Sequence, residues 1–289
     1  MMASKKLAFF PGCSLDGTGS EYGHSTLAVL EAIGKPAEIL EDWNCCGATA
    51  ARGIDLGLSV RLAGRNLALG AKQGCDVLVA CAACYNNMAF SREHLSKHPE
   101  DFCEPGFENA RPESVDVYHL LSVLSDEATL ETIGSKITNP LEDLVLASYY
   151  GCLLVRPGSY TNVDDRENPQ LMDKMMQLCG AKTVDWSYKT DCCGGSASLT
   201  RKPAAMKLMG RIFDDAMSRG ANAIVTACPL CHMNLDAFQK DVAAELGKDV
   251  SMPVFYFTEL LALAMGLEGT AKWFKGHLTN PASVVRNCR

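Results

Sequence analysis

The chain has 289 residues, of which 47% are hydrophobic and 21% charged, with a formal net charge of −7. This length suggests about two domains, and the composition is that of a globular protein and excludes a disordered one. The acidic balance argues against nucleic acid or an anionic membrane as the main partner. The longest apolar run, residues 77–85, is far shorter than the ~20 residues of a membrane helix, and the first residues contain no signal-peptide core. We therefore expect a cytoplasmic protein without a membrane span.

The first half of the chain alternates expected strands and helices. Apolar residues 6–10 predict a buried strand, and residues 25–33 predict a helix that ends at Gly34. A second helix is predicted over 56–72, before a strand over 76–80. A third strand-to-helix passage covers 115–124, whereas 103–112 and the surroundings of residues 139–140 have the composition of loops.

The second half repeats this order. A strand is predicted over 144–150, and a helix over 168–179, with Asn168 as N-cap, Pro169 in the first helical position and Gly180 at the end. A helix over 204–219, a strand over 223–227 and a passage over 254–265 follow. Such alternation predicts an α/β fold with two mainly parallel sheets, and we place the domains at 1–140 and 141–289.

Ten of the 14 cysteines form an internal repeat. Four of them recur 147 positions later: Cys45, Cys46, Cys81 and Cys84 correspond to Cys192, Cys193, Cys228 and Cys231. Cys13 recurs as Cys152, 139 positions later, so a single length difference of eight residues explains the mismatch. The remaining cysteines have no counterpart and are expected to be packing residues: Cys75, Cys103, Cys179 and Cys288.

The repeated cysteines follow predicted strand ends, which places each set on one rim of its sheet. Zinc needs four thiolates rather than five, and a thioredoxin-like Cys-x-x-Cys leaves three cysteines in each half unexplained. A purely structural role as buried thiols does not explain why the cysteines recur after 147 positions. Iron–sulfur ligation uses thiolates, although the three-cysteine run of a usual cubane site is absent. Gly47 and Gly194, after the double cysteines, let the backbone pass close to inorganic sulfur.

The pattern Cys-x₃₁-Cys-Cys-Gly-x₃₃-Cys-x₂-Cys resembles the CCG domain, and two complete copies in one chain resemble the B subunit of heterodisulfide reductases. The resemblance implies two Rossmann-like CCG domains related by pseudo-two-fold symmetry, and two noncubane [4Fe–4S] clusters. It assigns one cluster to Cys13, Cys45, Cys46, Cys81 and Cys84. It assigns the other to Cys152, Cys192, Cys193, Cys228 and Cys231.

The resemblance also implies a reaction and partners. In the family, the heterodisulfide of coenzyme M and coenzyme B enters between the clusters and is reduced to two thiols. Gly17, Gly19 and Gly23 lack the spacing of a dinucleotide site, so we expect neither NAD nor flavin on this chain. Electrons then come from a partner, which in the family is an iron–sulfur C subunit fed by a flavin-containing A subunit.

Two other functions stay open. One is a homologous subunit of bacterial sulfur or thiol metabolism, acting on a different disulfide or persulfide, including in the oxidative direction. The other is a non-catalytic electron-transfer or scaffold subunit. Because coenzyme M carries a sulfonate and coenzyme B a phosphate, a cleft without basic residues would count against those substrates. His24, His232 and Tyr85 are candidate proton donors, each weighed against a merely hydrogen-bonded role.

Overall fold

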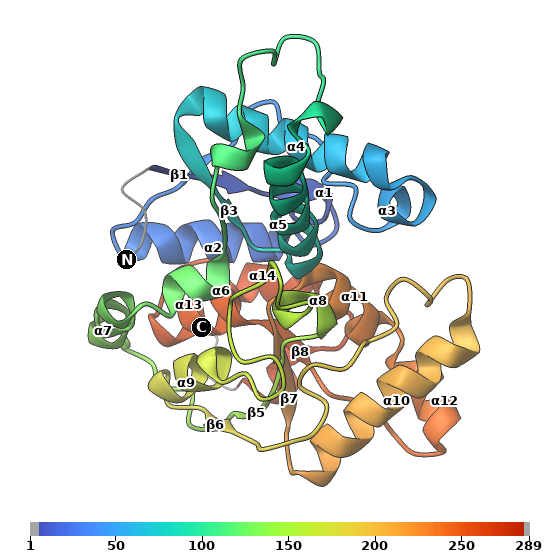
Figure 1. Ribbon diagram of the computed structural model, residues 1–289. Helices are drawn as coiled ribbons and strands as arrows, with labels where there is room; N and C mark the ends of the chain where they lie inside the picture. Colours follow the sequence, from blue (N-terminus) through green and yellow to red (C-terminus); the bar gives the residue numbers. More distant parts are fainter. Residues whose placement is uncertain (1–5, 286–289) are drawn as a thin grey trace.

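The computed structural model describes residues 6–285, so the first five residues and Cys288, expected to pack, lie outside the described residues. Two four-stranded sheets, all of whose strands are parallel, organise the chain (Figure 1). The α/β class and the two parallel sheets expected from the sequence are thus confirmed. None of the helices in residues 6–285 is both long and apolar enough to cross a membrane.

The two sheets have the same strand order. The first has the order β2-β1-β3-β4, from β1 (Lys6–Phe10), β2 (Glu38–Ile39), β3 (Cys75–Val79) and β4 (Val117–His119). The second has the order β6-β5-β7-β8, from β5 (Val145–Tyr149), β6 (Lys182–Thr183), β7 (Ala223–Thr226) and β8 (Val254–Tyr256). The central strands β3 and β7 are buried along their whole length, as is typical of parallel sheets covered on both faces.

Helices follow the strands in the same sequence in both halves. The first half contains α1 (Gly12–Leu15), α2 (Ser20–Ala32), α3 (Ala50–Ile54), α4 (Leu56–Gln73), α5 (Ala82–Lys97), η1 (Pro99–Asp101), η2 (Pro112–Ser114), α6 (Leu120–Leu124) and α7 (Glu127–Ser135). The second contains α8 (Cys152–Val155), α9 (Leu171–Leu178), α10 (Lys202–Ser218), α11 (Pro229–Ala237), α12 (Gln239–Leu246), α13 (Phe257–Ala264), α14 (Thr270–Trp273), η3 (Phe274–Gly276) and η4 (Pro281–Ser283).

The predicted start of α9 is wrong. Asn168 is not its N-cap and Pro169 does not occupy its first turn, because the helix begins at Leu171. A carboxylate oxygen of Asp164 accepts hydrogen bonds from the backbone N–H of residues 170 and 171, both at 2.7 Å. The Tyr150 hydroxyl accepts two more, from residues 172 and 173, at 2.8 and 3.2 Å. These side chains satisfy the free N–H groups of the first turn from outside the helix.

The halves pack through corresponding helices, which gives the molecule its pseudo-two-fold arrangement. Helix α2 of the first half packs against α13 of the second, and α6 of the first half packs against α9 of the second (Figure 1). At the centre of the larger contact, the buried hydroxyls of Ser25 and Thr258 lie 2.7 Å apart. The domain boundary near residue 140 stays a prediction.

Candidate functional site

The repeated cysteines lie beyond the carboxyl ends of the central strands. Cys13 is in α1, directly after β1, and Cys152 begins α8, shortly after β5. Cys81 and Cys228 are the N-cap residues of α5 and α11, which follow β3 and β7. Parallel strands carry their ligand sites at this edge of a sheet. Cysteines from loops and helix starts are therefore directed to a common rim in each half.

Five thiols gather in the first half, and we name Cys13, Cys45, Cys46, Cys81 and Cys84 the first thiol group. The Sγ atoms of Cys46 and Cys84 lie 3.0 Å apart. Cys45 and Cys13 are near enough for their charges to interact. Gly12 has a φ of +66°, and a Cβ on it would lie 3.4 Å from the Cys84 sulfur. Glycine here both permits the left-handed backbone and leaves room for the thiols.

The second thiol group, formed by Cys152, Cys192, Cys193, Cys228 and Cys231, has the same layout. The Sγ atoms of Cys193 and Cys231 lie 3.5 Å apart. Gly151 has a φ of +68°, and a Cβ on it would lie 3.2 Å from the Cys231 sulfur. The backbone N–H of Gly194 donates to the Cys192 sulfur at 3.3 Å. Backbone donors near the sulfurs are one of the means by which proteins tune iron–sulfur centres.

The glycines after the double cysteines have a more specific role than expected. Gly47 and Gly194 both have a φ of +75°, which favours glycine whatever lies nearby. A Cβ on Gly194 would also lie 3.0 Å from the Cα of Ala205 in α10. The glycine is therefore required by the turn and by the close helix, in addition to any approach of inorganic sulfur.

Two asparagines that the sequence analysis missed hold the double cysteines in place. Asn87 Nδ2 donates to the carbonyl oxygen of Cys46 at 2.6 Å, and Asn234 Nδ2 donates to that of Cys193 at 2.7 Å. Both side chains are buried. They are separated by 147 positions, the period of the cysteines, and this shared offset is the signal that would have found them.

The thiols act strongly on one another's protonation. The neighbouring thiols of Cys46 and Cys81, followed by burial, raise the pKa of Cys84. Cys193 and Cys228, followed by burial, raise that of Cys231. Hydrogen bonds from Cys45 and Cys84 lower the pKa of Cys46, because they stabilise its thiolate. Several thiolates cannot be ionised together in so small a volume unless a cation compensates their charge.

The donor sets fit iron–sulfur ligation. Every cysteine in residues 6–285 is a free thiol, and the sulfur separations above are far longer than a disulfide bond of ~2.05 Å. Cys13, Cys45 and Cys192 are exposed, whereas both Cys-x-x-Cys pairs are buried. An iron–sulfur cluster held by either thiol group would bind to buried sulfurs and would stay accessible on the side of the exposed cysteines.

The two thiol groups meet at the interface between the halves. The Cys228 thiol is the largest influence on the pKa of Cys81, which it raises. Nearby, three rings stack across the interface: His232 on Tyr256 at 4.0 Å between ring centroids, and Tyr256 on Tyr22 at 4.2 Å. The Tyr22 hydroxyl donates to the carbonyl oxygen of Ala80, next to Cys81, at 3.0 Å. The stack thus joins the neighbourhoods of Cys231 and Cys81.

A cavity of about 440 Å³ opens on this interface, and we name it the interdomain cavity. Residues from α1, α2 and the turn between them form one wall, and residues from α11, β8 and η3 form much of the other. Its lining residues are Ser14, Thr18, Gly19, Glu21, Pro229, Leu230, His232, Met233, Asp236, Ala237, Tyr256, Gly276 and Leu278. Ser14 follows Cys13, and Pro229 and Leu230 lie between Cys228 and Cys231, so the cavity adjoins both thiol groups.

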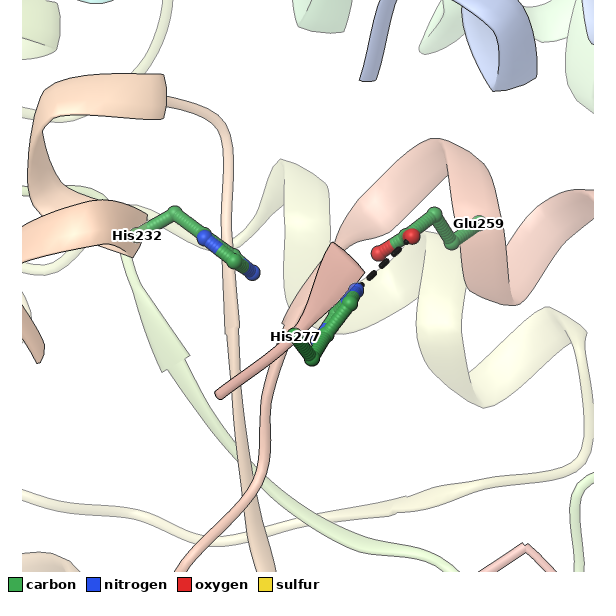
Figure 2. Close-up of side chains that lie close together, drawn as sticks. All are labelled: His232, Glu259 and His277. Atoms are coloured by element: carbon green, nitrogen blue, oxygen red, sulfur yellow. Dashed lines mark hydrogen bonds and ion pairs between the residues drawn. The ribbon is translucent and has the colours of Figure 1, made fainter. Parts of the chain in front are cut away.

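Behind the cavity lies a buried cluster of His232, Glu259 and His277 (Figure 2). His277 Nε2 lies 2.9 Å from a Glu259 oxygen, and both side chains are fully buried. Burial acts to lower the pKa of His277, but the hydrogen bond and charge of Glu259 outweigh it and leave the pKa raised. The rings of His232 and His277 are perpendicular, with centroids 4.8 Å apart. We interpret the cluster as an ion pair with a packed imidazole, because His277 and Glu259 are already hydrogen-bonded to each other.

The three candidate proton donors are placed differently. His232 lines the cavity and is buried. Tyr85 is buried at the corresponding position of the first half, beside His119, and burial raises its pKa. His24 is exposed on α2 and does not belong to the cavity lining. His277, by contrast, had no motif context, because it reaches the site from beyond the last strand.

Two of the cysteines outside the repeat pack as expected, since Cys75 and Cys179 are buried. The prediction for Cys103 is wrong, because this residue is exposed in the loop between η1 and η2. The loop runs over the surface, so the cysteine remains accessible rather than joining the core.

Comparisons with known proteins agree with this architecture. A family model described as "Cysteine-rich domain" (CCG) matches residues 7–89 and 146–236. The chain is 31% identical over 269 residues to the B subunit of the ferredoxin/F420H2-dependent CoB-CoM heterodisulfide reductase of Methanosarcina acetivorans, covering 90% of this chain and 89% of that one. It is also 31% identical over 267 residues to a protein of Wolinella succinogenes named 8-methylmenaquinol:fumarate reductase membrane anchor subunit, covering 91% and 93%.

One solved structure, of a hypothetical protein from Helicobacter pylori, superimposes with a TM-score of 0.71 at 12% identity. It covers 96% of this chain and 53% of that one, which shows a shared fold over about half of the larger protein.

Proposed function

Because the chain belongs to the family of CCG cysteine-rich domain proteins, we propose that it is the catalytic subunit of a heterodisulfide reductase-type complex. The observation that carries this proposal is the convergence of two five-thiol groups at one interface, beside a cavity. Each group would hold one noncubane [4Fe–4S] cluster, which when bound supplies electrons to the S–S bond. The complete reaction takes one disulfide, two electrons and two protons to two thiols.

The chain's own residues would position the reactants. Asn87 and Asn234 fix the backbone of the double cysteines, and Gly12 and Gly151 leave space for the sulfurs. The interdomain cavity would hold the substrate within one residue of Cys13, Cys228 and Cys231. Such placement turns the approach of the reactants into an intramolecular step.

Electrons would come from a partner, for which we propose an iron–sulfur C subunit supplied by a flavin-containing A subunit. Two exposed apolar side chains support a docking surface near the thiol groups. Ile54, 83% exposed, lies at the end of α3, and Leu199, 90% exposed, lies in the loop after Cys193. Single exposed apolar side chains are common on protein surfaces, so it is their position, eight residues after Cys46 and six after Cys193, that supports docking.

A second candidate function is a role within a fumarate reductase complex, as in the name of the Wolinella succinogenes relative. The observation that favours it is that neither lysine nor arginine is among the described residues that line the interdomain cavity. Such a wall suits an uncharged quinol better than a sulfonate or a phosphate. Reduction of the anaerobically purified protein by a menaquinol analogue, without turnover of any disulfide, would support this candidate over the first.

Disulfide turnover by the anaerobically purified chain, with a reduced viologen as electron donor, tests the main proposal. We expect Cys46→Ser and Cys193→Ser to lose turnover, since each removes a ligand from one thiol group. Cys103→Ser is the matched control, because Cys103 is exposed and lies outside both groups. Equal turnover in all three variants would refute the assignment.

A further inference from the structure

The interdomain cavity has the size of a small-molecule site. Its volume of about 440 Å³ lies within the range of ~300–1,000 Å³ that ligand pockets occupy. Pro229, Leu230, Met233, Tyr256 and Leu278 supply apolar wall, which suits short alkyl chains. The location of the cavity beside both thiol groups makes it the substrate site if the proposed function holds.

The charges of the cavity wall are negative. Glu21 and Asp236 line it, whereas no lysine or arginine of residues 6–285 does. Asp236 is held in place because its two carboxylate oxygens accept hydrogen bonds from the backbone N–H of Leu278 and Thr279, at 2.6 and 2.9 Å. The lysines nearest to the lining residues in the sequence, Lys240, Lys272 and Lys275, are exposed and outside the lining. Lys202 forms an ion pair with Asp241 at 2.7 Å.

Glu21 is the carboxyl group best placed to meet a ligand. It lies in the first turn of α2 and is only 8% exposed. Burial, followed by the charges of Glu259 and Asp236, raises its pKa against the opposing effects of its own backbone N–H and His277. The groups that face it are thus two carboxylates and one imidazole, and that imidazole is already paired with Glu259.

A buried imidazole beside the cavity has a nitrogen without a hydrogen-bond partner among the described residues. His232 is 4% exposed and lines the cavity, and its Nε2 atom has no hydrogen-bond partner among the described residues. Buried polar atoms without partners are rare in folded proteins and commonly mark a place that a ligand or a water completes. The Nε2 atom itself is closed off from the cavity, so the charge of the cavity wall comes from Glu21 and Asp236, and no lysine or arginine of the described residues lines it.

We propose that the interdomain cavity binds a disulfide whose arm carries an amine, and that Glu21 selects this arm over an acidic one. The inference rests on the proposed function and deepens it by naming the class of substrate. An ammonium group would be attracted by the negative charges of Glu21 and Asp236, whereas a carboxylate, sulfonate or phosphate would lose its hydration beside two like charges. The substrate class therefore differs from a disulfide whose arms end in a sulfonate and a phosphate.

Binding of non-reducible analogues tests the inference without any redox chemistry. Hexamethylenediamine, hexanediol and adipate match the chain lengths of cystamine, bis-hydroxyethyl disulfide and dithiodiglycolate, and differ from one another in the end group. The attraction between two opposite unit charges ~8 Å apart, at an effective dielectric constant of ~20, raises the binding affinity by a factor of about thirty before screening by salt. We expect calorimetry on the full chain at low salt to give about tenfold tighter binding of the diamine than of the diol, and weaker binding of adipate.

Glu21→Gln keeps the shape of the side chain and removes its charge. We expect this variant to lose about tenfold in diamine affinity and to leave hexanediol binding unchanged. Glu31→Gln is the matched control, because Glu31 is an exposed carboxylate on the same helix, outside the cavity lining. Equal binding of all three analogues, tightest binding of the diol or of adipate, or an equal effect of both variants would overturn the inference.

Turnover separates this inference from the proposed function. If cystamine is reduced with a higher kcat/KM than dithiodiglycolate, and Glu21→Gln reverses the order, both hold. Selective diamine binding without turnover of any disulfide would overturn the proposed function and leave the cavity assignment standing. Turnover that favours dithiodiglycolate would overturn the inference alone.

Discussion

Gly151 offers a sharp test of the second thiol group, because a methyl group added there would reach a sulfur. The Cβ of Gly151→Ala would lie 3.2 Å from the Cys231 Sγ, a contact tighter than nine in ten real Cβ contacts. The backbone of this residue, with φ +68° and ψ 176°, lies in a region essentially reserved for glycine, which adds about 1–3 kcal/mol of strain for alanine. Cys231 is buried against Cys193, so it has little room to move.

Gly220 supplies a control that also has a positive φ but no thiol contact. It follows α10 with a φ of +80°, and no described atom lies within 4 Å of the position that its Cβ would take. Gly151→Ala is expected to lose at least as much free energy of unfolding as Gly220→Ala, for which we expect about 1–2 kcal/mol. With about 2.1 cal/mol/K of unfolding entropy per residue, this corresponds to a decrease of about 2–3 °C in Tm.

Only Gly151→Ala is expected to lose iron. Anaerobic purification followed by iron and sulfide analysis should give about half of the wild-type content for Gly151→Ala and the full content for Gly220→Ala. Full iron content in Gly151→Ala would refute the assignment of Cys231 to a cluster. Equal iron loss in both variants would show that backbone strain, rather than the sulfur contact, is responsible.

Three further predictions address the asparagine clamp, the buried ion pair and the docking surface. Asn234→Ala leaves the Cys193 carbonyl without its donor, so we expect it to lower the free energy of unfolding by about 1–3 kcal/mol in chemical denaturation and to lower the iron content. Asn222→Ala, which lies outside the site, should keep its iron. Unchanged iron content in Asn234→Ala would contradict the role of this asparagine as a clamp. The raised pKa of His277 stabilises the fold fully below its ordinary value of 6.5, and this stability is lost as the pH rises through the raised pKa. Wild type should thus lose more unfolding free energy than His277→Gln between pH 6 and pH 8 in parallel urea titrations, and identical pH slopes would exclude the protonated pair. Ile54→Ser combined with Leu199→Ser should weaken co-purification with the electron-donating partner while the iron content stays at the wild-type level, and full co-purification would place the docking surface elsewhere.

The strands and both thiol groups could be predicted because their signals are local or periodic. Buried strands such as β8 are continuous apolar runs, and four of the five cysteine offsets have the same value of 147. The short strands β2 and β6 were missed, since two residues show no period. Asn87 and Asn234 share the cysteine offset, but an asparagine is too common a residue to attract notice without its partner carbonyl.

The rest of the site depends on contacts between distant segments. Glu21 and Asp236 meet at the cavity from different halves, and His277 arrives from beyond β8. The predicted start of α9 was wrong for the same reason, because Asp164 and Tyr150 cap the helix from outside. Tertiary contacts of this kind override the local pattern on which helix boundaries are predicted.

The proposal that two clusters lie in this chain is tested most directly by its metal and sulfide content. Anaerobically purified wild-type protein should contain about eight iron and about eight acid-labile sulfide per chain, as expected for two [4Fe–4S] clusters. Zinc with little sulfide would contradict the assignment of the ten repeated cysteines to iron–sulfur clusters.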